Sequence, residues 1–183
     1  MINKIETIPG GVLAVAKILS KFVKKVNLYT YGNNNNIEKY LIKEKNINII
    51  NLDKGQPIQT KTRYINSTRY EKLLQVTNFK KNFFSKTILK NINKKIKKIK
   101  NNLIICDFGN GLLENEILKT IDKIKVDKFI NVQTNSINYG YNLYTKYENK
   151  FNYLSLDERE WQLALGKKNL SDLGKILKLN KNT

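Results

Sequence analysis

The hydrophobic positions of this chain follow two spacings, and each spacing predicts one kind of element. Apolar residues that recur every three or four positions predict helices, whereas short alternating or continuous apolar runs predict strands. The predicted helices span residues 11–24, 37–45, 84–99, 113–124 and 158–165. The predicted strands span residues 26–31, 47–52, 58–65, 73–79, 103–108, 129–133 and 153–156.

From residue 84 onward, the predicted helices and strands alternate. Such alternation is typical of a parallel sheet that helices cover on both faces, with right-handed connections between the strands. The pattern therefore predicts an α/β fold, with a mostly parallel sheet flanked by helices. We expect a single domain that spans residues 1–183.

Residues 46–80 break the alternation, because strand-like runs follow one another there with few helical signals. The turn Asn66-Ser67-Thr68 joins two of these runs, which predicts a hairpin. Side chains alternate between the faces of a strand, so Lys61 and Arg63 share one face of the run 58–65. We expect this segment to form a small β lid, inserted in the α/β core, whose basic face covers a polar site or points to solvent.

Composition narrows the class of protein and its surroundings. The chain has 183 residues, of which 40% are hydrophobic, and this length suits one core. It lacks both the run of about 18 apolar residues that a membrane span needs and the features of a signal peptide. Its single cysteine, Cys106, lies in an apolar run. We therefore expect no membrane partner and a reducing, cytoplasmic location.

The formal net charge of +19 raises the question of a polyanionic partner. The basic residues are mostly lysines spread along the chain, which is also rich in asparagine and isoleucine, as AT-rich codon usage produces. The only arginines are Arg63, Arg69 and Arg159. Proteins that read or stack on bases rely on arginine and exposed aromatic residues. The even spread of lysines and the scarcity of arginines therefore disfavour nucleic acid as a partner. Polyanion binding stays the weaker alternative.

The chain contains no histidine. This absence excludes catalysis by Ser-His-Asp or Cys-His groups and any metal site built on histidine. A lone cysteine also excludes a zinc ribbon. Any chemistry must therefore use carboxylates, lysines, amides or backbone donors.

Two glycine-containing turns are candidates for ligand contacts. Gly10-Gly11 precedes a predicted helix, where a missing side chain lets a ligand approach the backbone, although a plain turn before a helix explains it equally well. Asp107-Phe-Gly-Asn-Gly111 ends a predicted strand and begins a helix, so its amides could bind an anion or sugar hydroxyls. The Asp-Phe-Gly triplet does not indicate a protein kinase, because no glycine-rich loop or His-Arg-Asp loop accompanies it.

Polar side chains also follow the next two predicted strands. Gln133 and Asn135 begin an amide-rich loop after one strand, and Asp157 and Glu160 follow the other. Ligands of open α/β sheets bind where strand C-termini meet loops, so these groups could share one site. Composition alone favours a plain polar loop enriched in asparagine by codon usage, and the helix dipole fully explains the two acidic residues.

Taken in order, these segments resemble the ribokinase-like (PfkB) carbohydrate kinases, in particular the heptose-7-phosphate kinase branch related to ADP-heptose synthases. Gly10-Gly11-Val-Leu-Ala-Val-Ala16 is similar to the family's sugar-lining Gly-Gly segment, and Pro57-Ile-Gln-Thr-Lys-Thr-Arg63 to the first strand of its lid. Asp107-Phe-Gly-Asn-Gly111 resembles the turn beside the sugar. Asn131-Val-Gln-Thr-Asn-Ser, continuing to Lys146-Tyr147, resembles a long run of the branch. Asp157-Glu-Arg-Glu160 corresponds to the family's Asn-x-x-Glu.

The resemblance, which covers most of residues 8–166, implies ATP-dependent phosphorylation of a sugar or sugar phosphate. A heptose phosphate used in nucleotide-sugar and surface-polysaccharide biosynthesis is the expected substrate, with ATP and Mg²⁺ as cofactors. The implied substrate-binding residues are Gly10, Gly11, Lys61, Arg63, Asp107, Gly109, Gln133 and Asn135. Lys61 and Arg63 would contact a substrate phosphate, and Glu160 with Asp157 would order Mg²⁺ through water. The lid would support a homodimer.

The sequence also departs from the family pattern. Ala14 stands where the family has a sugar-binding asparagine, and the usual first strand with its aspartate does not precede Gly10. The Gly-Ala-Gly-Asp motif, whose aspartate is the family's catalytic base, is not found before Thr183. We therefore expect a ribokinase-like domain truncated at both ends, with no catalytic residue of its own, that needs a complementing polypeptide for activity. The alternative is a non-catalytic module for sugar binding or dimerisation.

Overall fold

The computed structural model describes residues 4–134, 141–147 and 151–166. Parallel strand pairs connected by helices confirm the mixed α/β class. The chain divides into two compact units, Met1–Phe83 and Phe84–Thr183, which are described one at a time. Within the described ranges, no helix has both the length and the apolar character needed to cross a membrane.

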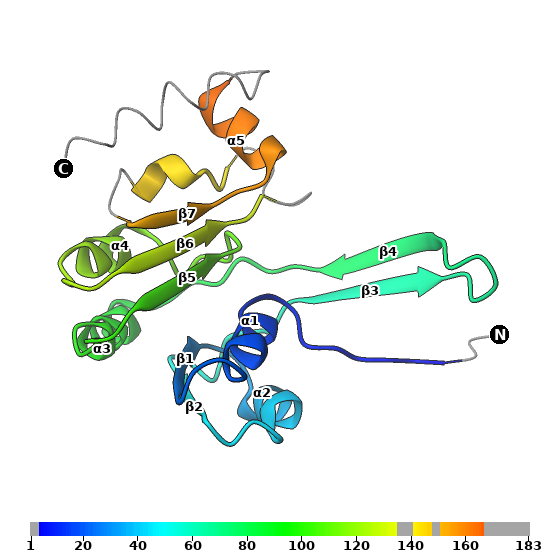
Figure 1. Ribbon diagram of the computed structural model, residues 1–183, viewed down its shortest axis with the longest axis horizontal. Coiled ribbons are helices and arrows are strands. Elements are labelled where there is room, and N and C mark those ends of the chain that lie inside the picture. The colour runs from blue at the N-terminus through cyan, green and yellow to red at the C-terminus, as the bar shows by residue number, and fades with distance from the viewer. Residues whose placement is uncertain (1–3, 135–140, 148–150, 167–183) are drawn as a thin grey trace. The chain divides into compact units, whose positions relative to one another are not determined.

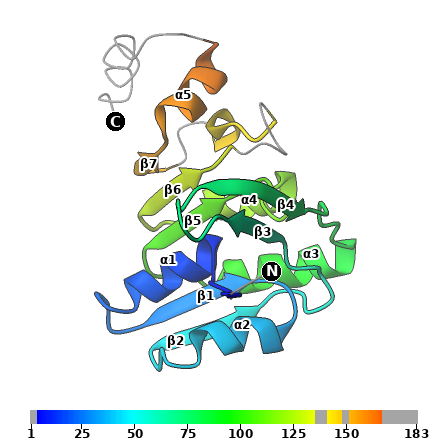
Figure 2. The same ribbon diagram turned by 90° about the vertical axis from the view of Figure 1, so that its right-hand side faces the viewer.

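The first unit begins with a pair of parallel strands and two helices (Figure 2). Helix α1 (Gly11–Leu19) is followed by β1 (Val26–Thr30), α2 (Asn34–Leu41) and β2 (Ile47–Asn51). Their shared core consists of Ala16, Leu28, Ile37 and Leu41. Helices α1 and α2 and strand β1 supply these four residues, each from an apolar face at the period of its own element, and β2 packs against them.

Strand β2 corrects the predicted extent of the lid. We expected residues 46–80 to form one β insertion, but Ile47–Asn51 pairs in parallel with β1, from Val26↔Ile47 to Thr30↔Asn51. Ile47 and Ile49 pack against the core of this unit, and helix α2 supplies the crossover that a parallel pair requires. The insertion is therefore confined to the hairpin that follows.

The hairpin consists of the antiparallel strands β3 (Thr60–Ile65) and β4 (Lys72–Asn78), drawn as a two-stranded ribbon in Figure 1. Asn66 organises its turn, because its side-chain oxygen accepts hydrogen bonds from the backbone N–H groups of Thr68 and Arg69. Every residue of β3 is exposed. The predicted hairpin and its turn are thus confirmed.

The second unit contains a three-stranded parallel sheet in the order β5–β6–β7 (Figure 1). Its elements are α3 (Lys86–Ile96), β5 (Leu103–Asp107), α4 (Asn115–Asp122), β6 (Lys128–Val132), a short 3₁₀ helix η1 (Tyr144–Tyr147), β7 (Tyr153–Ser155) and α5 (Glu158–Leu165). The buried apolar residues on α3, α4, β5 and β6 are Ile92, Ile96, Ile105, Ile117, Ile121, Ile130 and Val132. Parallel pairing places the carboxyl ends of the three strands at one edge of the sheet.

Candidate functional site

The ends of β5 and β6 lie next to each other and are joined by a hydrogen bond between backbone groups. Asp107 is the last residue of β5, and the N–H group of Gln133, just after β6, donates a 2.8 Å hydrogen bond to its carbonyl oxygen. Asn131, within β6, donates from its side chain to the carbonyl oxygen of Ser155, the last residue of β7. The predicted positions Asp107 and Gln133 therefore meet at one sheet edge, where α/β proteins bind ligands.

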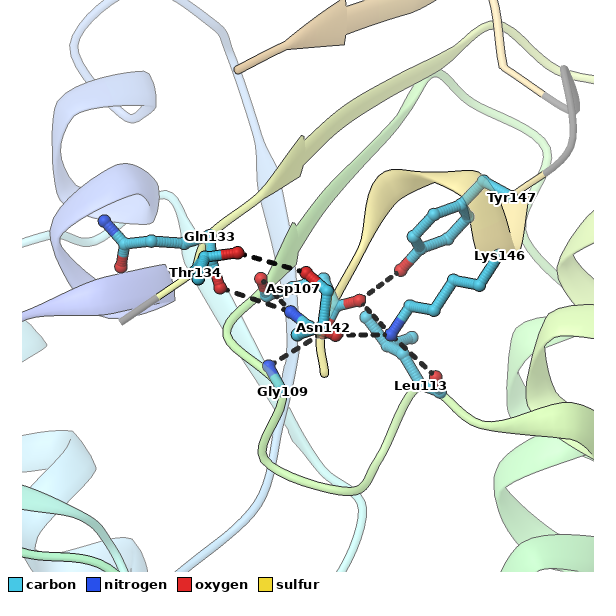
Figure 3. Close-up of polar contacts among 8 residues, drawn as sticks. All are labelled: Asp107, Gly109, Leu113, Gln133, Thr134, Asn142, Lys146 and Tyr147. Carbon is cyan, nitrogen blue, oxygen red and sulfur yellow. Dashed lines mark hydrogen bonds and ion pairs between the residues drawn. The ribbon is translucent and has the colours of Figure 1, made fainter. Parts of the chain in front are cut away.

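The carboxylate of Asp107 is the centre of this edge, and the residue is only 3% exposed. Its Oδ1 atom accepts a hydrogen bond of 3.0 Å from the backbone N–H group of Gly109. Its Oδ2 atom accepts a 2.8 Å hydrogen bond from the hydroxyl group of Tyr147 and forms an ion pair with Lys146 (Figure 3). A buried charge needs such partners. Asp107 therefore organises the site as part of its framework, in addition to the sugar contact that the resemblance predicts.

Asn142 holds the two strand ends together. Its side-chain nitrogen donates hydrogen bonds of 3.2 Å to the carbonyl oxygens of both Asp107 and Gln133. Its side-chain oxygen accepts a 2.7 Å hydrogen bond from Lys146, and its carbonyl oxygen accepts one from the hydroxyl group of Thr134. All of these contacts are internal, so the 4% exposed Asn142 acts as a structural bridge between β5 and β6.

Burial changes the acidity of two neighbours of Asp107. Burial, followed by the negative charge of Asp107 and the hydrogen bond to it, raises the pKa of Tyr147 far above its usual value. Tyr147 is therefore a protonated hydrogen-bond donor at physiological pH. Burial also raises the pKa of the Cys106 thiol, so this cysteine is a poor nucleophile.

The turn after β5 carries the groups that are best placed to meet a ligand. Gly109 and Gly111 adopt positive φ angles of 70° and 94°, which favour glycine. The side-chain oxygen of Asn110, between them, is buried and accepts no hydrogen bond. Figure 3 also shows the side chain of Gln133 directed away from the cluster around Asp107. Neutral amide and backbone groups of this kind suit hydroxyl-bearing ligands better than cations.

Asp157 and Glu160 form a capping box at the start of α5, as their spacing allows. The Oε2 atom of Glu160 accepts from the backbone N–H group of Asp157, and its Oε1 atom accepts a 2.9 Å hydrogen bond from the N–H group of Thr134. Glu160 is 6% exposed. Its Oε2 atom completes the cap of α5, and its Oε1 atom joins this helix to the segment that follows β6. Across the described ranges, no three acidic or sulfur-containing side chains are grouped as a metal site. The predicted contact of Glu160 and Asp157 with Mg²⁺ through water stays a prediction.

The other predicted contacts belong to the first unit. Gly10 caps α1 without a side-chain hydrogen bond, and Gly11 begins the helix with a φ angle of 54°. Lys61 and Arg63 share one exposed face of β3, as predicted, opposite Thr77 and Gln75 of β4. Arg63 donates a 3.0 Å hydrogen bond to Gln75. Their roles toward a sugar or a phosphate stay predictions.

In the second unit, the structure joins Asp107, Gly109 and Gln133 in one network, to which Glu160 is tied through Thr134. Asn135 lies outside the described residues. Sequence reasoning assigned no role to Asn142, Lys146 or Tyr147, although all three belong to the run 131–147 that carries the resemblance. The four-residue spacing of Asn142 and Lys146 is a signal that the two side chains can meet. Their common partner, Asp107, is too distant in the sequence for any local pattern to reveal.

Comparison of the chain with protein families, with curated proteins and with solved structures finds no match.

Proposed function

We propose that this chain forms the sugar-binding part of a ribokinase-like (PfkB) carbohydrate kinase, of the type that phosphorylates heptose 7-phosphate or a related sugar phosphate. One observation carries the proposal: the Asp107–Gly111 turn and Gln133 lie side by side at the ends of β5 and β6 and share one hydrogen-bond network. These are two of the segments that resemble the family. Their meeting at one sheet edge is what a common sugar site requires.

The chemistry of this edge supports a sugar as the ligand. The backbone of the Gly109–Gly111 turn and the side chain of Asn110 offer neutral donors and acceptors, which match hydroxyl groups. The unpaired oxygen of Asn110 would accept a hydrogen bond from such a hydroxyl. The charged groups Asp107 and Lys146 neutralise each other and do not by themselves attract an ion.

Sugar binding and phosphoryl transfer depend on different groups. In the resembling family, transfer from ATP uses the aspartate and the amides of the Gly-Ala-Gly-Asp motif, which do not occur among the matched residues 8–166. Positioning and charge stabilisation around the moving phosphoryl group provide most of the rate of such reactions. We therefore expect the chain by itself to bind sugar phosphate without turnover. ATP and Mg²⁺ would act once a polypeptide carrying that motif completes the site.

A coupled sugar-kinase assay with heptose 7-phosphate and ATP tests the proposal, alongside calorimetric titration of the chain with the same sugar phosphate. We expect binding by the chain and turnover only when a polypeptide with Gly-Ala-Gly-Asp is added. Replacement of Asn110 by alanine should weaken the binding about tenfold, because one hydrogen bond to a hydroxyl is lost. The absence of binding by the wild-type chain would rule out the proposed substrate.

A second candidate function is a dimerisation module without catalysis, which the hairpin favours. Tyr64 pairs with Leu74 across the strands, and Thr62 pairs with Val76. Tyr64, Leu74 and Val76 are 44%, 55% and 50% exposed, although they share one face. An exposed apolar face on an isolated hairpin suits a contact with a second copy of the chain.

A further inference from the structure

The side chain of Lys146 contacts three different segments of the second unit. Its ammonium group pairs with Asp107 at the end of β5, donates to the side-chain oxygen of Asn142 at 2.7 Å, and lies 3.4 Å from the carbonyl oxygen of Leu113. An ammonium group has three N–H donors, and here three acceptors surround it. Figure 3 shows these partners converging on the Nζ atom.

Two of these three acceptors belong to residues at opposite ends of one turn, which runs from Asp107 to Leu113. Asp107 precedes Phe108, and Leu113 closes the segment before α4, so one ammonium group holds the turn at both ends. Glycines at 109 and 111 give the backbone of this turn more accessible conformations than other residues would, and the N–H group of Gly109 donates a hydrogen bond to Asp107 within it. A flexible segment of this composition needs an external constraint to present its amides in one arrangement.

We propose that Lys146 is a positioning residue, which fixes the turn from Asp107 to Leu113 and thereby presents Gly109, Asn110 and Gly111 to a ligand. The positive charge of Lys146 matters in addition to its hydrogen bonds, because the side chain of Asp107 is only 3% exposed and water cannot stabilise its negative charge. The side chain of Lys146 is 28% exposed. A neutral side chain at 146 would leave the buried carboxylate with one N–H and one O–H donor. The part of this inference that concerns a ligand rests on the proposed sugar-binding function, whereas the constraint on the turn does not.

Hydrogen exchange measured by mass spectrometry tests the constraint on the turn without any ligand. In K146M, we expect the amides of residues 108–113 to exchange about tenfold to hundredfold faster, which corresponds to losing hydrogen bonds to a charged group. Exchange in α3 should not change. K146R keeps the positive charge and should retain most of the protection, and K123M, at an exposed lysine of the same unit, should resemble the wild type.

The double variant D107N/K146M covers the case in which K146M does not fold, since it leaves no uncompensated buried charge. It too should show fast exchange in residues 108–113, because both ends of the turn are released. Unchanged exchange there, or an equal increase throughout the second unit, would overturn the proposal. For the ligand, titration with heptose 7-phosphate should show weaker binding by K146M and recovery in K146R. If the wild type binds no sugar phosphate, the proposed function fails while the exchange result still decides the role of Lys146.

Discussion

The hydroxyl group of Tyr147 donates a 2.8 Å hydrogen bond to the same carboxylate oxygen of Asp107 that pairs with Lys146. Tyr147 is 2% exposed and Asp107 is 3% exposed, so the bond forms away from water. It attaches the 3₁₀ helix η1 to the end of β5. Because the proton of this bond is needed for the contact, the stability of the second unit depends on Tyr147 remaining protonated.

Replacement of Tyr147 by phenylalanine should lower the free energy of unfolding by about 1.5–3 kcal/mol at neutral pH, the usual contribution of a hydrogen bond to a charged group. The ring and its packing are retained, so the loss reports the hydroxyl group alone. Urea unfolding followed by circular dichroism measures it. The matched control is Tyr141→Phe at a 91% exposed residue, where a change within about 0.5 kcal/mol is expected. Equal stability of the two variants would show that the bond contributes nothing.

The pH dependence of unfolding provides a separate prediction about Tyr147. Its folded-state pKa is raised above the unfolded value of about 10, so the contribution is present below pH 10 and is lost as the pH rises further. Between about pH 10 and 11, the unfolding free energy of the wild type should fall by about 1 kcal/mol more than that of Tyr147→Phe, because the unfolded tyrosine ionises progressively over this range. Parallel curves for the two proteins would contradict the raised pKa.

Glu160→Ala should be the most damaging change at the start of α5. It removes the acceptor for two backbone N–H groups, those of Asp157 and Thr134, and leaves the latter without its partner. We expect a loss of about 3 kcal/mol in unfolding free energy, compared with about 1 kcal/mol for Asp157→Ala, which removes the helix cap alone. Glu158→Gln, at an exposed neighbour in the same turn, serves as the control. If Glu160→Ala cost no more than Asp157→Ala, the contact between Glu160 and Thr134 would be unimportant.

Much of the fold could be predicted from local patterns, because the spacing of apolar residues and the residues that begin or end a helix are features of short segments. Helix α5 spans Glu158–Leu165 as predicted, since Asp157 and Glu160 have the spacing of a capping box. The helix predicted for 11–24 ends earlier, at Leu19. Its apolar periodicity continues into Phe22 and Val23, but these residues are 80% and 45% exposed and make no core contact that would extend the helix.

Long-range pairing was harder to predict. Strand β2 has the apolar run of a strand, but its sequence does not say whether it pairs with β1 or with the hairpin, and packing against Leu28 and Ile37 decides between them. The candidate site shows the same division. Asp107 and Gln133 lie at the ends of predicted strands and were identified from that position. The contacts of Lys146 with Asp107 and Leu113 depend on tertiary structure and could not be read from any local pattern.

Gly11→Ala and Gly10→Ala form a matched pair for the start of α1. Gly11 has a φ angle of 54°, which costs a residue with a side chain about 1–2 kcal/mol. Gly10 has an extended backbone, and an added Cβ atom would meet nothing within 4 Å. Thermal unfolding should therefore show a lower midpoint for Gly11→Ala and almost no change for Gly10→Ala. Both variants also test the predicted sugar contact, since weaker sugar binding by a stable Gly10→Ala would place a ligand at this backbone.

The hairpin gives the sharpest test of self-association, because its two faces differ in polarity. Val76 and Leu74 lie on the apolar face, whereas Gln75 and Thr77 lie opposite Arg63 and Lys61 on the polar face. If the apolar face joins two copies, Leu74→Lys should place a charge in the contact and convert dimers to monomers in sedimentation velocity experiments, with a dissociation constant raised at least tenfold. Thr77→Lys adds the same charge to the other face of the same strand and should leave the dimer intact. A wild-type monomer at all concentrations would refute this use of the hairpin, and equal dissociation of both variants would indicate an effect of net charge alone.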